Sequence, residues 1–194
     1  GSEKLTASTV GCDANWPRSS AIVYQTARTL GGGKLLPMHG RYVGAAHSNM
    51  SQWRVDRGSK RGPGWIAQLG SRGQLHVIFD ANLFKSWLSS QLSSSVGGIQ
   101  LYGDSAKQHL MIADQLSAEI GIDVEARGNS ATEWKALPGR DNHLLDCLCM
   151  ASVLGSYSGG LLPGQESKLK KSKRWTQAEI EEKRKENRAI SRRV

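Results

Sequence analysis

Three side chains that can bind a metal ion stand at two distant places in the sequence. Asp13 follows a run of small residues, whereas His143 and Asp146 lie three residues apart, on the same side of a helix if that segment is helical. Carboxylate oxygens, with an occasional imidazole, suit Mg²⁺ and Mn²⁺, and two such ions can drive phosphodiester hydrolysis. Asp13, His143 and Asp146 are therefore the candidate catalytic and metal-binding residues.

The segment that begins at Leu144 is apolar on almost every face, which is typical of a buried helix. A carboxylate buried without a partner costs several kcal/mol. Asp146 is therefore expected to meet a cation, unless the helix is less buried than its composition indicates. The alternative without a metal ion, in which His143 and Asp146 only hydrogen-bond to each other, stays open at this point.

Two further acidic residues could join the metal ligands, Asp80 and Asp141, but each precedes a predicted helix. A side-chain oxygen at that position commonly caps the first turn, so N-capping is the favoured role of both. For Asp141 a contact in the outer shell of the metal site is the alternative. Lys85, one turn into the helix after Asp80, could meet a phosphate or lie on the solvated surface.

The elements that position these residues alternate between strands and helices. Asp13 ends the first strand of a strand–helix–strand unit, the place where open α/β sheets bind their ligands. Expected elements are strands at 5–12, 34–38, 75–79, 99–102 and 122–125, and helices over 22–30, 84–92, 105–120 and 144–155. A loop is expected over 128–139. The fold class is α/β.

Residues 39–73 have no clean period and are rich in Gly, Arg and Ser, so they read as a long functional or solvated loop. Trp53 and Trp65 are expected to pack beneath it. Basic residues in and beyond this loop are candidates for DNA binding: Arg41, Lys60, Arg61, Lys85 and Lys135.

The net charge of +9 is unevenly placed. Residues 166–194 hold 11 of the 26 Lys and Arg and 5 of the 17 acidic residues, a net +6 that leaves only +3 for the body. Basicity alone therefore does not make the body a nucleic-acid binder. No apolar run is long enough to span a bilayer, no phosphate-binding loop or Gly-x-Ser-x-Gly elbow is present, and the three cysteines lack the spacing of a zinc site.

Several short blocks together resemble the large terminase subunits of tailed phages, in the lambda-like GpA branch. The early blocks are Gly11-Cys12-Asp13-Ala14-Asn15-Trp16, Val23-Tyr24-Gln25 and His39-Gly40-Arg41-Tyr42-Val43-Gly44-Ala45. The later blocks are Phe84-Lys85-Ser86, Thr132-Glu133-Trp134-Lys135 and Asp141-Asn142-His143-Leu144-Leu145-Asp146-Cys147. Their order and spacing match that family from about Val10 to Ser156.

This resemblance implies an RNase H-like nuclease domain over 3–158: a mixed sheet flanked by helices that cuts double-stranded DNA with two Mg²⁺ or Mn²⁺ ions. Residues 1–2 would be a cloning remnant, and 159–194 a basic linker with a charged helical tail. The family's first acid stands on a central strand that leads into a hairpin, whereas Asp13 leads into a helix. Asp13 thus matches the second acid, with the first strands upstream of residue 1. The alternative makes Asp13 the first acid and Asp80 the second.

The resemblance also implies the portal, the capsid and the small terminase subunit as partners, no membrane, and the host cell cytoplasm as location. A competing hypothesis makes the chain a non-catalytic module that binds DNA or the portal through the 39–73 loop and the tail. Such a module would bind DNA in a salt-sensitive manner, without regard to metal or Asp146.

Overall fold

The computed structural model describes residues 6–31, 33–71, 73–95, 98–103 and 105–160. The chain divides into two compact units, Gly1–Pro163 and Gly164–Val194. The second unit, and with it nearly all of the predicted linker and tail at 159–194, lies outside the described residues. Within the described part, no helix has both the length and the apolar character needed to cross a membrane.

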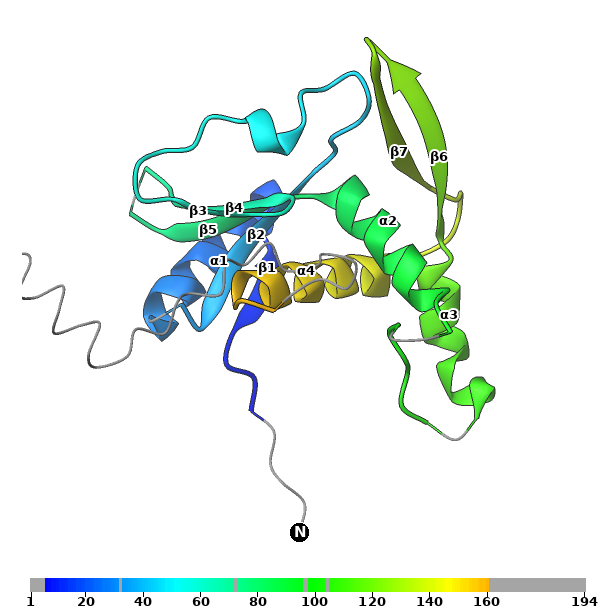
Figure 1. Cartoon of the computed structure of the whole chain (residues 1–194). Helices are drawn as coiled ribbons and strands as arrows, with labels where there is room; N and C mark the ends of the chain where they lie inside the picture. Colours follow the sequence, from blue (N-terminus) through cyan, green and yellow to red (C-terminus); the bar gives the residue numbers. More distant parts are fainter. Residues whose placement is uncertain (1–5, 32, 72, 96–97, 104, 161–194) are drawn as a thin grey trace, which may run out of the picture. The chain divides into compact units, whose positions relative to one another are not determined.

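A five-stranded mixed sheet forms the centre of the first unit (Figure 1). Its strands, in the order β1-β2-β5-β4-β3, are β1 Val10–Asp13, β2 Leu35–Arg41, β5 Leu75–Asp80, β4 Trp65–Leu69 and β3 Lys60–Gly62. The first three run parallel, and β4 and β3 join as antiparallel strands. This arrangement confirms the predicted mixed α/β fold and is consistent with the RNase H-like fold.

Helices lie on both faces of the sheet. Helix α1, Pro17–Leu30, connects β1 to β2 and contacts one face, where Tyr24 meets His39. Helix α2, Ala81–Leu92, and helix α4, His143–Tyr157, contact each other and the other face. Shorter elements are α3 Leu110–Leu116 and the 3₁₀ turns Met50–Gln52 and Ala106–His109. The predicted flanking helices are thus confirmed.

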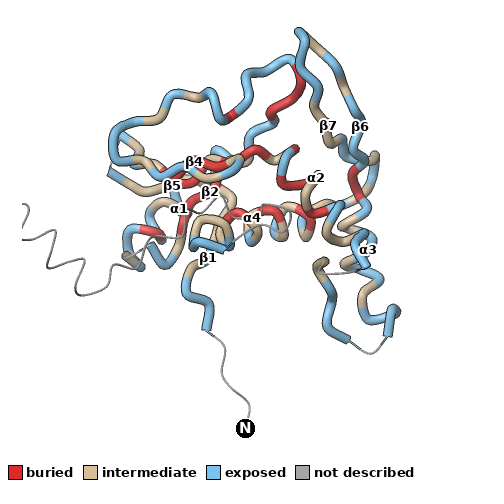
Figure 2. The backbone as a smooth tube through the Cα atoms, viewed as in Figure 1, coloured by how far each residue is buried: buried red, intermediate tan, exposed pale blue. Residues whose placement is uncertain are grey.

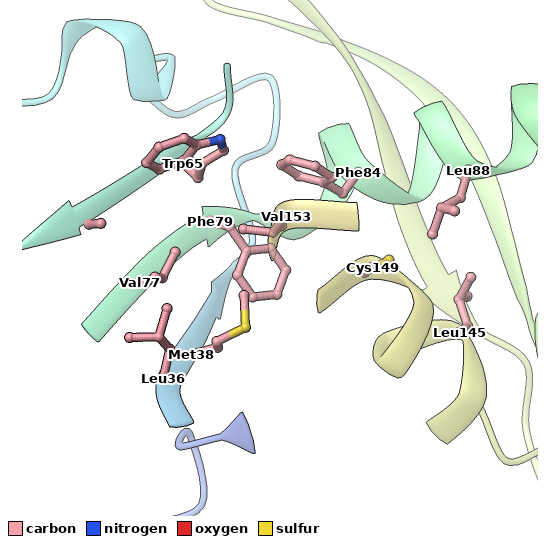
Figure 3. Packing of buried hydrophobic residues seen from close by; sticks show 11 residues of the cluster. Leu36, Met38, Trp65, Val77, Phe79, Phe84, Leu88, Leu145, Cys149 and Val153 are labelled. Atoms are coloured by element: carbon pink, nitrogen blue, oxygen red, sulfur yellow. The ribbon is translucent and has the colours of Figure 1, made fainter. Parts of the chain in front are cut away.

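The core forms between the sheet and the pair α2 and α4 (Figures 2 and 3). Alternate residues of the strands point to one face, which is why both β2 and β5 send every second side chain inward. Figure 3 shows the sheet side chains facing those of α4. The buried cluster comprises Leu36, Met38, Trp65, Ala67, Val77, Phe79, Phe84, Leu88, Leu145, Cys149 and Val153.

A separate antiparallel hairpin, β6 Glu119–Ala126 and β7 Asn129–Ala136, follows α3 and projects beyond α2 (Figure 1). The predicted loop over 128–139 is therefore wrong over most of its length. The turn has positive φ at both central residues, 53° at Arg127 and 77° at Gly128. Two-residue hairpin turns of type I′ require this conformation, and Arg-Gly lacks the Asn-Gly signature that would have revealed it.

Three other segments differ from the sequence-based prediction. The helix expected over 105–120 ends at Leu116, and β6 begins at Glu119, because residues 119–126 pair with β7 instead of continuing the helix. Residues 99–102 do not form a strand. The expected loop over 39–73 contains β3 and β4, since Trp65–Leu69 pairs along β5 and buries Trp65 beneath the end of α4.

Replacing Phe84 by Ala should lower the free energy of unfolding by about 3–5 kcal/mol, because the substitution leaves a cavity in a fully packed site. Phe84 is 1% exposed and its ring meets that of Phe79 edge-on, with centroids 6.1 Å apart. Urea unfolding measures the effect. The neighbouring Leu83→Ala is the control, because Leu83 is 47% exposed. Equal losses for the two variants would contradict this packing.

Candidate active site

Asp146 lies in the first turn of α4. The sequence predicted either a cation beside its carboxylate or a helix less buried than its composition indicates, and both are found. Its side chain is 48% exposed, so the helix is less buried here than its composition indicates. A cation is also present: the Nζ atom of Lys85 on α2 lies 3.1 Å from Asp146 Oδ1. The partner of Asp146 in the described structure is thus a lysine.

Lys85 is buried, with its side chain 10% exposed, and its main partner is Glu119 at the start of β6. The Nζ–Oε1 distance is 2.5 Å, and the same Glu119 oxygen accepts a hydrogen bond of 2.6 Å from Asn142 Nδ2. Burial alone would lower the pKa of Lys85, but the bond to Glu119 and the charges of Asp146 and Glu119 outweigh it and raise the pKa. Lys85 is therefore a charged, buried centre.

Sequence reasoning weighed Lys85 only as a phosphate contact or a surface lysine, and it missed Glu119 altogether. A signal for Lys85 was present: it follows Phe84 and lies three residues before Leu88, which places it beside the apolar stripe of the helix. Glu119 was hidden because residues 105–120 were assigned to one amphipathic helix. Its role depends on the turn from α3 into β6, which the sequence did not reveal.

His143 and Asp141 stand apart from this network. The His143 side chain is 77% exposed, and its Nε2 lies 3.9 Å from Asp141 Oδ1. No hydrogen bond between His143 and Asp146 is found among the described residues, so the alternative that they simply bond to each other is not realised. The predicted N-cap at Asp141 is wrong, because Asn142 occupies that position and the cap has no side-chain bond.

Asp13 ends β1 at the edge of the sheet, and its Oδ1 accepts a 3.0 Å hydrogen bond from the Asn15 backbone N–H. Residues 11 and 13 share one face of the strand. A Cβ atom on Gly11 would lie 3.1 Å from Leu154 Cδ1, so this face is the one that α4 covers. Asp13 therefore lies on the side of the sheet that α4 covers.

The opposite face behind Asp13 holds a hydrogen-bonded chain with a defined direction. Asn15 Nδ2 donates to Gly40 O at 3.3 Å, so Asn15 Oδ1 is left to accept from His39 Nδ1 at 3.2 Å. Burial, with the charges of His76 and Arg41, lowers the pKa of His39 and so favours the neutral imidazole. In that form His39 Nε2 accepts from the Tyr24 hydroxyl at 2.8 Å.

Asp80 caps α2 as predicted, since its Oδ1 accepts from Leu83 N at 3.1 Å. Burial raises the pKa of Asp80.

The position of Asp13 in the sheet bears on which of the family's acidic residues it matches. Strand β1 is an edge strand paired only with β2 in the described sheet, and it leads into α1. Asp13 thus lacks the central, hairpin-linked position of a first acid.

Among the described residues, no three His, Cys, Asp or Glu side chains gather closely enough to hold a metal ion. Asp13, His143 and Asp146 share one side of the sheet without forming a ready ligand set. Their assignment as metal ligands and catalytic residues stays a prediction. The same holds for the ligand roles of Asp80 and Asp141.

The candidate DNA-binding residues are engaged to different degrees. Lys60 Nζ donates to Tyr157 O at the end of α4 at 2.5 Å, and Arg61 donates to the carbonyls of Ser51 and Trp53. Lys85 is buried and paired with Glu119 and Asp146, so in this conformation its ammonium group is not available at the surface for a DNA phosphate. Arg41 and Lys135 are exposed at the ends of β2 and β7.

The sequence blocks behind the family resemblance meet in space. Glu133 of the hairpin accepts hydrogen bonds from the Tyr42 hydroxyl and, at 3.2 Å, from Ala45 N. The next residue, Trp134, donates from its indole to Ser86 Oγ at 2.9 Å. Buried Asn82 completes the junction, because it donates to Val43 O and accepts from Trp134 N. Four of the blocks, 39–45, 84–86, 132–135 and 141–147, thus meet around the N-terminal half of α2. The last of them joins through the ion pair of Asp146 with Lys85.

Comparison with known families identifies the chain. Residues 1–159 match the family described as terminase large subunit gpA, endonuclease domain. The chain belongs to this family, which confirms the resemblance found in the sequence and gives it a nuclease role in DNA packaging. Searches of curated proteins and of solved structures found no match.

The His39 chain predicts a pH dependence of stability. Between the lowered pKa of folded His39 and its usual value near 6.5, the unfolded chain binds more protons than the folded one. Stability should therefore fall as the pH drops from 7 through this window. His39→Gln should flatten this slope in urea unfolding, whereas the exposed His47→Gln should keep it. A slope unchanged in His39→Gln would contradict the assignment of a neutral His39.

Proposed function

We propose that this chain is a divalent-metal-dependent endodeoxyribonuclease domain that cleaves double-stranded DNA during phage genome packaging. The observation that carries the proposal is Asp146: a half-exposed carboxylate on a helix whose other face is buried against the sheet, within a domain of the terminase endonuclease family. One of its oxygens is held by Lys85. Asp13 points to the same side of the sheet.

The residues fit Mg²⁺ or Mn²⁺ by the chemistry of their donor atoms. Asp13 and Asp146 offer carboxylate oxygens, and exposed His143 offers an imidazole one turn from Asp146. In this proposal these three residues hold the metal ions. The number of ions, two, is taken from the family resemblance. Bound there, the ions would stabilise charge on the phosphodiester and lower the pKa of the attacking water. Since these residues form no complete ligand set, solvent or DNA oxygens, or a further acidic residue, would complete the coordination.

The chain's own residues would hold the DNA beside this site. Exposed Arg41 and Lys135 are available for phosphate contacts, and phosphate binding of this kind weakens with salt. By family, DNA is the substrate and the packaging machinery the partner. The portal, the capsid and the small terminase subunit are proposed as specific partners, and the host cell cytoplasm as the place of action.

Replacing Asp146 by Asn should abolish Mn²⁺ binding, measured by calorimetry, and metal-dependent nicking of supercoiled plasmid. The neutral amide keeps the size of the side chain but is a far poorer ligand for a hard cation. Asp56→Asn, an exposed acid in the 39–73 segment, is the matched control and should leave both signals unchanged.

Each remaining outcome has a defined meaning. Binding without nicking in the unmodified chain would indicate that catalysis needs a further acid, as the match of Asp13 to the second acid implies. Tight, salt-sensitive DNA binding with no metal-dependent signal would contradict the nuclease proposal and favour the non-catalytic DNA- or portal-binding module. Nicking that survives in Asp146→Asn would remove Asp146 from the site.

A further inference from the structure

The buried lysine at the junction of α2, β6 and α4 has no assigned role in the chemistry. Its ammonium group lies between two carboxylates, 2.5 Å from Glu119 and 3.1 Å from Asp146. The two carboxylates differ in exposure: the Glu119 side chain is 4% exposed and that of Asp146 is 48% exposed. The ammonium therefore links a fixed interior acid to an acid that faces solvent.

Glu119 is the anchor of this arrangement. It is fixed at the first residue of β6, and its Oε1 receives Asn142 Nδ2 as well as Lys85 Nζ. Asn142 is the N-cap residue of α4, four positions before Asp146. Glu119 thus binds the start of the helix that carries Asp146 and, through Lys85, the Asp146 side chain itself. Both contacts fix Asp146 relative to the sheet.

We infer that Lys85, held by Glu119, is a positioning residue that orients the Asp146 carboxylate toward a bound cation. Lys85 occupies Oδ1, whereas Oδ2 has no hydrogen bond or ion pair among the described residues, on a side chain that is 48% exposed. A carboxylate held at one oxygen can offer the other to a metal ion with little loss of rotamer freedom. The inference rests on the proposed function in taking Asp146 as a metal ligand.

The charges of the network suit this role. One ammonium against two carboxylates leaves a net charge of −1, carried at the exposed end. Lys85 without Glu119 would instead neutralise Asp146 and oppose a cation there. Glu119 therefore offsets the positive charge of Lys85, so that the lysine can hold Asp146 without repelling a bound cation. A lysine without such a second carboxylate would repel the cation.

The double variant Lys85→Met/Glu119→Gln tests the inference. It removes one positive and one negative charge, so the net charge stays the same; both replacements are close in size to the original side chains, and the amide oxygen of the new side chain at position 119 can still accept from Asn142 Nδ2. Asp146 should then sample several rotamers, seen as averaged Hα–Hβ scalar couplings by NMR in the metal-free protein. Mn²⁺ affinity should fall by about tenfold or more, the usual effect of losing a residue that orients a ligand.

Matched variants separate positioning from folding. Lys85→Arg keeps the positive charge, can still bridge both carboxylates and should keep a single Asp146 rotamer, whereas Lys34→Met, at an exposed lysine, should change nothing. If the double variant does not fold, Asp146→Asn probes the same contact from its exposed side: the ¹⁵Nζ signal of Lys85 should shift in that variant.

A single, unchanged Asp146 rotamer in the folded double variant, or an unshifted Lys85 signal in Asp146→Asn, would overturn the inference. A rotamer that becomes averaged while Mn²⁺ affinity stays constant would also overturn it, because positioning would then serve no cation. Failure of the proposed function looks different: the unmodified chain would bind no Mn²⁺, and the couplings alone would decide whether Lys85 orients Asp146.

Discussion

The buried ion pair of Lys85 and Glu119 is the constraint on which the arrangement of this domain depends. Removing a charge from water costs several kcal/mol unless a partner and hydrogen bonds compensate for it. Here the partners come from three separate elements, since Lys85 lies on α2, Glu119 opens β6, and Asn142 stands at the N-cap position of α4. The pair is satisfied only when all three meet, so it fixes their relative positions and, with them, that of Asp146.

The same logic explains why a family can be identified from short and scattered blocks. Each block is weak alone, but in the folded chain they bond to one another: Glu133 to the segment of Tyr42, Trp134 to Ser86, and Lys85 to Asp146. These contacts hold the β6–β7 hairpin against α2 and the loop after β2. The contacts thus join segments that are far apart in the sequence into one structural unit.

The sequence revealed what depends on local patterns and missed what depends on contacts between distant segments. Apolar periodicity predicted the parallel strands and the main helices, and Asp80 was recognised as a cap because N-capping is local. Of the hairpin over 119–136 only a short strand at 122–125 was predicted; its pairing with β7 was missed, because its turn uses Arg127-Gly128 in place of a typical hairpin turn sequence and its strands are mostly exposed. Glu119 was lost with it, so the cation predicted for Asp146 could not be traced to Lys85.

The most direct test of this account is a crystal structure of the protein with Mn²⁺, located by its anomalous scattering. If Lys85 orients Asp146 toward a cation, a peak should lie about 2.0–2.3 Å from one Asp146 oxygen, within the range of hard-cation coordination, with Lys85 still bound to the other oxygen and to Glu119. A peak remote from Asp146, or one that replaces Lys85 at Asp146 Oδ1, would contradict it.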